Sequence, residues 1–277
     1  MPTPLLASLI DITSAATTAI LQVYRNAFEV TYKSPGDPLT TADTNANTLI
    51  CEKLRARFPS AAIVAEESPP EDFAGFTTKD QVFFVDPLDG TREFVARNGE
   101  FVVMIGLVEA EGVRAGVIHA PVSGLVWCGE VGKGAWRIDE DGSASVIQPS
   151  SHATLQGAKL AVSRSRTPRK LRALASRAGI GEVVRIGSAG LKGAAVAEGS
   201  VDLYVAPGNA GCRWDVCAPD AIITAAGGAL TDAFGERYDY RDAELDNTRG
   251  IAAGNTVLHA EALDWLRRNT RSTSVGR

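Results

Sequence analysis

The chain has 277 residues, of which 45% are hydrophobic and 22% are charged, and its formal net charge is −5 at pH 7. This length suffices for one large domain or two modest domains with a substantial buried core. The acidic balance argues against a nucleic-acid polymer as the partner, since proteins that bind one usually carry a basic face.

The first half of the chain is predicted to begin with two helices. The first starts at Thr3-Pro4, and apolar residues recur at helical spacing through Tyr24. The second is expected from about 41 to 58, with Asp43 in its first turn, where a carboxylate complements the helix dipole. Strands are then expected near 61–65, 81–85, 101–109, 113–120 and 124–130.

The second half is predicted to alternate strands with helices. The polar segment 139–151 is typical of an exposed loop and a domain boundary, which divides the chain into 1–150 and 151–277. Alternation implies a mixed or parallel sheet with helices over it. The tail from Asn269, rich in Ser, Thr and Arg, is expected to fray. The expected elements are strands near 158–163, 183–187 and 201–206 and helices near 167–179, 189–198 and 215–227.

The run DPLDGT, which begins at Asp86, is the most informative motif of the chain. The proline keeps Asp86 extended, so the apolar strand VFFV before it is expected to end there. Asp86 and Asp89, with the Leu88 carbonyl between them, offer oxygen ligands that suit a hard cation such as Mg²⁺. Gly90 and Thr91 follow, where a turn and a helix N-terminus could offer N–H groups to a phosphate. Adjacent metal and phosphate sites indicate metal-assisted hydrolysis of a phosphate ester.

Two further acidic positions decide whether this motif is more than a turn. Alone, Asp-Pro-Leu-Asp-Gly is also good turn chemistry. Glu66 and Glu67 end the apolar run AAIVA, although a solvated surface pair is the ordinary interpretation. Asp215 follows Trp214 and precedes an apolar helical stretch, where an ordinary helix N-cap is the alternative.

Together these positions resemble the inositol monophosphatase superfamily of Mg²⁺-dependent, lithium-sensitive phosphatases. The resemblance runs from Asp43 to about Gly228, and its pieces are ADTNAN, AEE, DPLDGT, GSAGLK and WD, in that order. DPLDGTREFVARNGEF at 86–101 and AEGSVDLYVAP at 197–207 look most like the 3'(2'),5'-bisphosphate nucleotidase branch. One departure is VCAPDA after Asp215, where that branch usually has small residues ending in Gly-His.

The resemblance implies an α/β fold with an α+β N-terminal half and an α/β C-terminal half. The layers would form an α-β-α-β-α sandwich of the inositol monophosphatase and fructose-1,6-bisphosphatase type, with the active site between the halves. Two or three Mg²⁺ ions are expected there. Two of them, about 3.5–4 Å apart, would clamp an in-line displacement. The expected ligands are Glu66, Asp86 and the Leu88 carbonyl for one ion, and Asp86, Asp89 and Asp215 for a second.

The resemblance also assigns catalytic and substrate-binding roles. Thr91 would hydrogen-bond the attacking water, with Asp43 accepting its proton as in the nucleotidase branch, or Glu66 as in the inositol branch. Ser188 and Lys192 stand near where nucleotidases contact the distal phosphate. Arg164 and Arg166 in SRSR could bind a second phosphate or the sugar, and solvated loop charges are the alternative. The complete set of expected substrate contacts is Asp89, Gly90, Thr91, Arg164, Arg166, Ser188 and Lys192.

Three functions remain open at this point. The favoured one removes the 3'-phosphate from adenosine 3',5'-bisphosphate. The second is an inositol-1-monophosphatase or a related sugar monophosphatase with the same metals. The third is a catalytically silent sensor of metal or phosphate, which the presence of every expected ligand and of Thr91 argues against.

The remaining expectations concern the cellular setting. The four cysteines are scattered and no secretory signal precedes the fold, so reduced thiols in a bacterial-type cytoplasm are expected, and Cys212 and Cys217 lack the companions of a zinc site. No apolar stretch approaches the roughly 18 residues that span a bilayer. Some nucleotidases associate peripherally with the inner membrane, which nothing in this sequence indicates. A homodimer is a further possibility that the sequence leaves open.

Overall fold

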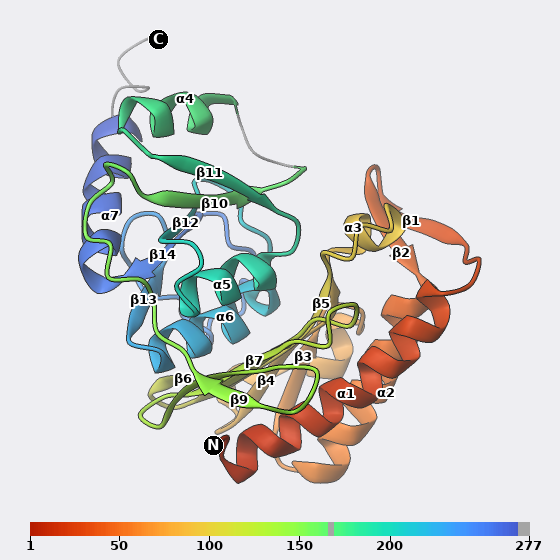
Figure 1. Cartoon of the computed structure of the whole chain (residues 1–277). Helices are drawn as coiled ribbons and strands as arrows, with labels where there is room; N and C mark the ends of the chain where they lie inside the picture. The colour runs from red at the N-terminus through yellow and green to blue at the C-terminus, as the bar shows by residue number, and fades with distance from the viewer. Residues whose placement is uncertain (166–168, 271–277) are drawn as a thin grey trace.

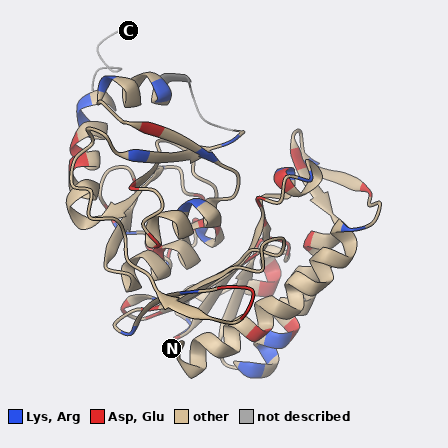
Figure 2. Ribbon diagram, in the orientation of Figure 1, with Lys and Arg blue, Asp and Glu red and all other residues tan. Residues whose placement is uncertain are grey.

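The computed structural model describes residues 1–165 and 169–270. Two helices, α1 (Pro4–Tyr24) and α2 (Thr41–Arg57), cover one face of a seven-stranded sheet. Helices α5 (Ala189–Ala197) and α6 (Arg213–Ala225) lie between that sheet and a five-stranded sheet, and α4 (Arg169–Arg177) and α7 (Thr256–Thr270) cover the outer face (Figure 1). The expected α-β-α-β-α layering is confirmed. Acidic and basic residues occur on both halves (Figure 2).

Helices α1 and α2 begin where the sequence predicts. The Thr3 side chain accepts a hydrogen bond from the Leu6 amide and caps α1, and Thr40 caps α2. By length and composition α1 is the one described helix that could cross a membrane, a property that a buried core helix shares. The sequence did not predict a spanning helix there, because Ser and Thr residues interrupt the apolar run. Its apolar side packs against α2 and the sheet.

The seven-stranded sheet has the order β3-β4-β5-β6-β7-β8-β9. Strands β3 and β4 are parallel, and the other neighbours are antiparallel. The strands are β3 (Ala62–Ala65), β4 (Val82–Asp89), β5 (Val102–Glu109), β6 (Gly112–His119), β7 (Val126–Glu130), β8 (Gly134–Ile138) and β9 (Ala144–Val146).

Two predictions about this sheet are wrong in detail. Strand β4 continues past Asp86 to Asp89, because the proline is accommodated at an irregularity in the pairing with β5 between these two residues. The segment 139–151 is not wholly a loop, since β9 lies within it and pairs with β8. All three residues of β9 are exposed at the sheet edge, and the polar residues on either side of them make the whole segment resemble a loop in sequence.

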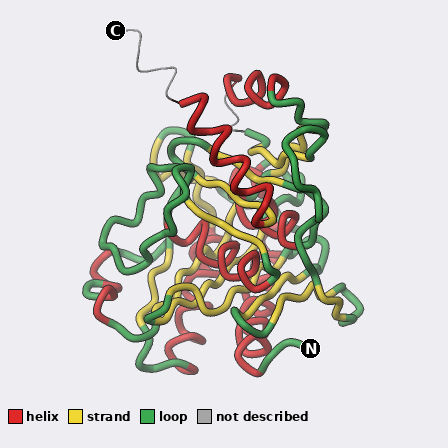
Figure 3. The backbone as a smooth tube through the Cα atoms, turned by 90° about the vertical axis from the view of Figure 1, so that its left-hand side faces the viewer, coloured by secondary structure: helices red, strands yellow, loops and turns green. Residues whose placement is uncertain are grey.

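The five-stranded sheet has the order β11-β10-β12-β14-β13. Strands β10 (Lys159–Ser163), β11 (Glu182–Ile186) and β12 (Leu203–Ala206) were predicted, as were α4, α5 and α6. Strands β13 (Gly228–Thr231) and β14 (Ile251–Asn255) were not predicted, and neither was α7, which crosses the outer face in Figure 3. The predicted frayed tail begins too early, since Asn269 lies in α7, and its remainder, 271–277, lies outside the described residues. The hairpin of β1 (Val30–Ser34) and β2 (Asp37–Thr40) was also missed. The short helices are η1 (Pro70–Phe73), η2 (Phe76–Thr78) and α3 (Thr91–Val95).

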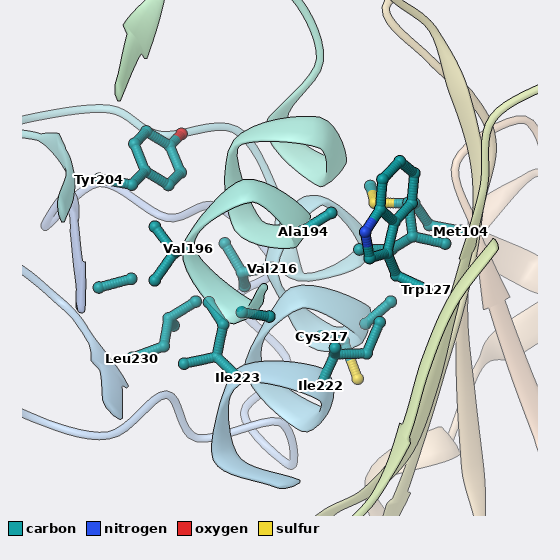
Figure 4. Packing of buried hydrophobic residues seen from close by; sticks show 14 of the residues in the cluster. Met104, Trp127, Ala194, Val196, Tyr204, Val216, Cys217, Ile222, Ile223 and Leu230 are labelled. Carbon is teal, nitrogen blue, oxygen red and sulfur yellow. The ribbon is translucent and has the colours of Figure 1, made fainter. Parts of the chain in front are cut away.

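Glycines on the first sheet bring α6 close to it. A Cβ at Gly106 would lie 2.5 Å from the Cys217 Sγ, and one at Gly116 would lie 2.5 Å from the Ala218 carbonyl oxygen. Cys217 and Ile222 accordingly face the sheet, as Figure 4 shows. Residues of both halves therefore share one core, and the division at residue 150 stays a prediction.

Candidate active site

A cleft of about 470 Å³ opens between the two halves. The N-terminal half contributes the β1–β2 hairpin, the turn after β3, the end of β4 and the start of α3. The C-terminal half contributes the carboxyl ends of β10 and β12 and the N-termini of α5 and α6. Such edges, where strands end and helices begin, are where α/β folds place ligands.

Three carboxylates converge at the bottom of this cleft. Asp86, Asp89 and Asp215 each offer an oxygen, and these oxygens lie within 4.8 Å of one another, the one such group in the described part of the chain. Asp86 is 1% exposed and Asp89 is 8% exposed. Burial raises the pKa of Asp86 well above its ordinary value, and the charges of Glu66, Asp89 and Asp215 raise it further. A negative cluster of this kind is stabilised by a bound cation or by a proton on one of its carboxylates.

The end of β4 aims Asp86 and Asp89 at one point. The Asp86 Oδ1 accepts a hydrogen bond from the Leu88 amide at 3.0 Å. Gly90 then turns the chain with φ of +101°, and a Cβ there would lie 2.9 Å from the Glu100 carbonyl oxygen, so only glycine fits. Thr91 opens α3 directly after this turn.

Asp215 reaches the cluster from the first turn of α6. Its Oδ2 accepts a hydrogen bond from the Cys212 amide at 2.6 Å, so Asp215 stabilises the helix start from the third helical position, while the N-cap residue itself is Cys212 and not Asp215. Gly211 has φ of +80°, and a Cβ there would lie 2.2 Å from the same oxygen. The capping contact and the place in the cluster are thus compatible.

Glu66 lies in the cleft beside a cation that the sequence did not indicate. The Lys33 Nζ lies 2.8 Å from Glu66 and 2.7 Å from Glu67. Burial raises the pKa of Glu66 despite the opposing effect of Lys33. Burial likewise raises the pKa of Glu67 to about 7. Lys33 was missed although residues 28–33 alternate between apolar and polar side chains, a strand signal that the sequence prediction did not use.

The structure brings Asp43 and Thr91 together as expected. The Thr91 hydroxyl donates to the Asp43 Oδ1 at 3.0 Å and lies 3.3 Å from the Leu88 carbonyl oxygen. The other oxygen of Asp43 accepts from the Thr40 amide at 2.8 Å and from the Thr40 hydroxyl at 2.6 Å. Burial raises the pKa of Asp43, and these hydrogen bonds oppose the shift. Asp43 is therefore a buried acceptor held in one orientation.

The residues predicted to recognise the substrate have other partners in the structure. Lys192 lines the cleft, but its Nζ donates to the carbonyls of Gly187 at 2.9 Å and Ser188 at 2.5 Å. Burial lowers the pKa of Lys192 to about 8. Arg164 is exposed, donates to both carboxylate oxygens of Glu100 and does not line the described cleft.

Ser188 lies at the N-terminus of α5, and its hydroxyl donates to Asp89. Arg166 lies outside the described residues. The four cysteines are free thiols. The polar side chains around Asp86, Asp89 and Asp215 are thus better defined than those that would hold the remote part of a substrate.

The donor set suits a hard divalent cation. The clustered ligands are carboxylate oxygens, with the Leu88 carbonyl on the same turn, and no imidazole or thiolate belongs to the described cluster. Oxygen-only sites of this charge favour Mg²⁺ over softer metals. The residues present therefore fit the magnesium that the sequence predicted.

Comparison with known proteins agrees with this geometry. A family model for the inositol monophosphatase family matches residues 1–271. The 3'(2'),5'-bisphosphate nucleotidase CysQ of Salmonella typhimurium is 37% identical over 228 residues, which cover 82% of this chain and 89% of that protein. CysQ of Escherichia coli O157:H7 is 36% identical over 231 residues, with the same coverage of 82% and 89%.

Solved structures show the same architecture. The extragenic suppressor protein suhB of Bartonella henselae superposes with a TM-score of 0.82 at 25% identity, covering 96% of this chain and 99% of that one. The match of the family model extends over nearly all of the sequence, and the relatives are aligned over most of their own length. The chain belongs to the inositol monophosphatase family.

Proposed function

We propose that this phosphatase removes the 3'-phosphate from adenosine 3',5'-bisphosphate with the help of two or three Mg²⁺ ions. The convergence of Asp86, Asp89 and Asp215 beside the Asp43–Thr91 pair carries the proposal. The substrate is supported by the similarity to proteins named 3'(2'),5'-bisphosphate nucleotidase, of whose length the alignments cover 89%.

The metal ligands we propose are the carboxylates of the cleft together with one backbone carbonyl. Bound Mg²⁺ would neutralise charge on the phosphoryl oxygens and acidify a water molecule. Asp86 is buried, and the charges of Glu66, Asp89 and Asp215 add to the effect of burial in raising its pKa. The proposed set is Glu66, Asp86, Leu88, Asp89 and Asp215.

Thr91 and Asp43 are proposed to orient the attacking water and take its proton. The Thr91 hydroxyl donates its hydrogen to Asp43, so a lone pair of its oxygen can accept a hydrogen from water. The proton can then pass through Thr91 to the Asp43 Oδ1. Thr40 donates hydrogen bonds to the other Asp43 oxygen, so the Oδ1 is the oxygen that stays directed at Thr91. Glu66, paired with Lys33, is the alternative acceptor.

The phosphate is proposed to lie against the turn that follows β4. Gly90 and Thr91 both line the cleft, and Thr91 begins α3, where amide groups lack acceptors within the helix. The distal phosphate is assigned to the ammonium group of Lys192, the described cation of the C-terminal half that lines the cleft.

The test is steady-state phosphate release from adenosine 3',5'-bisphosphate and from inositol 1-phosphate, each with Mg²⁺ and with EDTA. We expect the bisphosphate to have the larger kcat/KM and EDTA to abolish both reactions. A preference for inositol 1-phosphate would favour the inositol or sugar monophosphatase function. Phosphate release that survives EDTA would contradict the metal chemistry.

A further inference from the structure

The carboxylate of Asp89 belongs to the N-terminal half but is held by the C-terminal half. Its Oδ2 accepts hydrogen bonds from the Gly190 amide at 2.7 Å and from the Ser188 hydroxyl. Both donors lie at the N-terminus of α5, and Ser188 is 1% exposed. Among the described residues, no hydrogen bond reaches the Oδ1 of Asp89.

The Ser188 hydroxyl can donate only to Asp89. A hydroxyl has one hydrogen, and the Ser188 oxygen already accepts from the Leu191 amide at 3.0 Å as the cap of α5. Its hydrogen therefore points to Asp89. A hydrogen bond to a carboxylate is stronger than one between neutral groups, so these two bonds fix the rotation of the Asp89 side chain.

The N-terminus of α5 cannot shift freely, because it is packed on both sides. A Cβ at Gly190 would lie 2.6 Å from the Met104 Sδ on β5, and one at Gly187 would lie 2.5 Å from the Glu93 Cγ. Figure 4 shows Met104 on the side of α5 that faces the first sheet. The buried Lys192 ammonium group ties down the carbonyls of Gly187 and Ser188.

We propose that Ser188 is a positioning residue for the metal centre and not a contact for the substrate. With the Gly190 amide, it holds the Asp89 Oδ2 so that Oδ1 is the oxygen offered to Mg²⁺. The Mg²⁺ affinity of the site then depends on the position of α5 in the second half, in addition to the ligand Asp215 that α6 supplies. The inference rests on the proposed function only in taking Mg²⁺ as the ion.

The test is isothermal titration calorimetry of the full chain with Mg²⁺ alone, which measures the Kd for the ion. It compares the wild type with Ser188→Ala, Ser188→Gly and Ser188→Thr. We expect Ser188→Ala to raise the Kd for Mg²⁺ roughly 10-fold, the size of effect typical when a group that orients a metal ligand is lost. Ser188→Gly should do the same while capping the helix nearly as well as serine, which covers the case in which the alanine variant fails to fold. Ser188→Thr keeps the hydroxyl and should restore the affinity.

Kinetics separate this role from substrate binding. At saturating Mg²⁺, Ser188→Gly should keep the KM of the wild type for its phosphorylated substrate. An unchanged Kd for Mg²⁺ together with a raised substrate KM would overturn the proposal. So would a threonine variant as weak as the glycine variant. Turnover of the bisphosphate by the wild type tests the proposed function separately, since the Mg²⁺ titration needs no substrate.

Discussion

At the scale of single residues, each carboxylate of the cluster is oriented by a hydrogen bond from the protein. Asp86 accepts from the Leu88 amide, Asp215 from the Cys212 amide, and Asp89 from the N-terminus of α5. The first two contacts are local in sequence, so the turn and the helix start that supply them were predictable. The third joins residues about a hundred positions apart, and no spacing in the sequence reveals it.

Asp89→Asn replaces a charged ligand with a neutral one of the same shape. We expect kcat to fall about 10³-fold, because several kcal/mol of charge stabilisation are lost at the centre. Circular dichroism should show an unchanged fold. Asp37→Asn is the matched control, since Asp37 lines the same cleft outside the cluster. Turnover by Asp89→Asn equal to that of the control would refute the metal scheme.

Thr91→Ala removes the hydroxyl that links water to Asp43. The expected loss in kcat is roughly 10²-fold or more, the range of a lost proton transfer, while Thr91→Ser should keep most of the activity. The kcat of each variant is measured by stopped assays of phosphate release at saturating Mg²⁺. An alanine variant as active as the serine variant would show that the Thr91–Asp43 contact is structural only.

At the scale of elements, α6 carries a buried acid, Asp220, that the mechanism does not use. Asp220 lies five positions after Asp215, is 8% exposed and accepts a hydrogen bond from the Tyr240 hydroxyl at 2.9 Å. Burial raises its pKa from 3.8 to about 6, although the hydrogen bonds from Tyr240 and Thr224 oppose the shift. This aspartate is part of the VCAPDA departure from the nucleotidase pattern.

The raised pKa makes Asp220 a source of pH-dependent instability. The folded protein holds this proton more tightly than the unfolded chain, so the free energy of unfolding falls as the pH rises from about 4 to about 6. Asp220→Asn mimics the protonated acid. Its advantage over the wild type should grow by roughly 1 kcal/mol between pH 5 and pH 8, measured by urea unfolding. A difference that does not depend on pH would contradict this account.

The elements that were predicted are those with a strong local signal. Helices α1 and α2 have caps and periodic apolar residues, and β4 is a continuous apolar run before DPLDGT. Strand β14 (Ile251–Asn255) is nearly as buried but consists of small residues without alternation, so its sequence resembles a loop. The strand that carries Lys33 does follow an alternating segment, residues 28–33, but it is short and mostly exposed. Partners that tertiary packing supplies, such as Glu100 for Arg164, were beyond prediction.

At the scale of the whole molecule, the two halves meet at the cleft and each supplies part of the site. The N-terminal half provides Asp86, Asp89, Thr91 and Asp43, and the C-terminal half provides Asp215, Ser188 and Lys192. Arg164 and Glu100 join the halves again, outside the residues that line the cleft. A substrate that reaches from the metals to Lys192 would contact both halves.

Lys192→Met removes the ammonium group but keeps a side chain of similar length. If that group binds the distal phosphate, the KM for adenosine 3',5'-bisphosphate should rise about 10-fold or more, since a hydrogen bond to a charged group is worth roughly 1.5–3 kcal/mol. The KM for inositol 1-phosphate should change little. Equal losses for both substrates would assign Lys192 to holding the α5 turn. The KM of Arg164→Ala for the bisphosphate, measured in parallel, shows whether the guanidinium group bound to Glu100 contributes to substrate binding.

The most direct test of the central claim is product analysis by ³¹P NMR. The purified full chain is mixed with adenosine 3',5'-bisphosphate, and the reaction is started with Mg²⁺. The account predicts inorganic phosphate and adenosine 5'-monophosphate in equal amounts, and no reaction in EDTA. An intact bisphosphate alongside hydrolysed inositol 1-phosphate, or equal turnover with and without Mg²⁺, would contradict it.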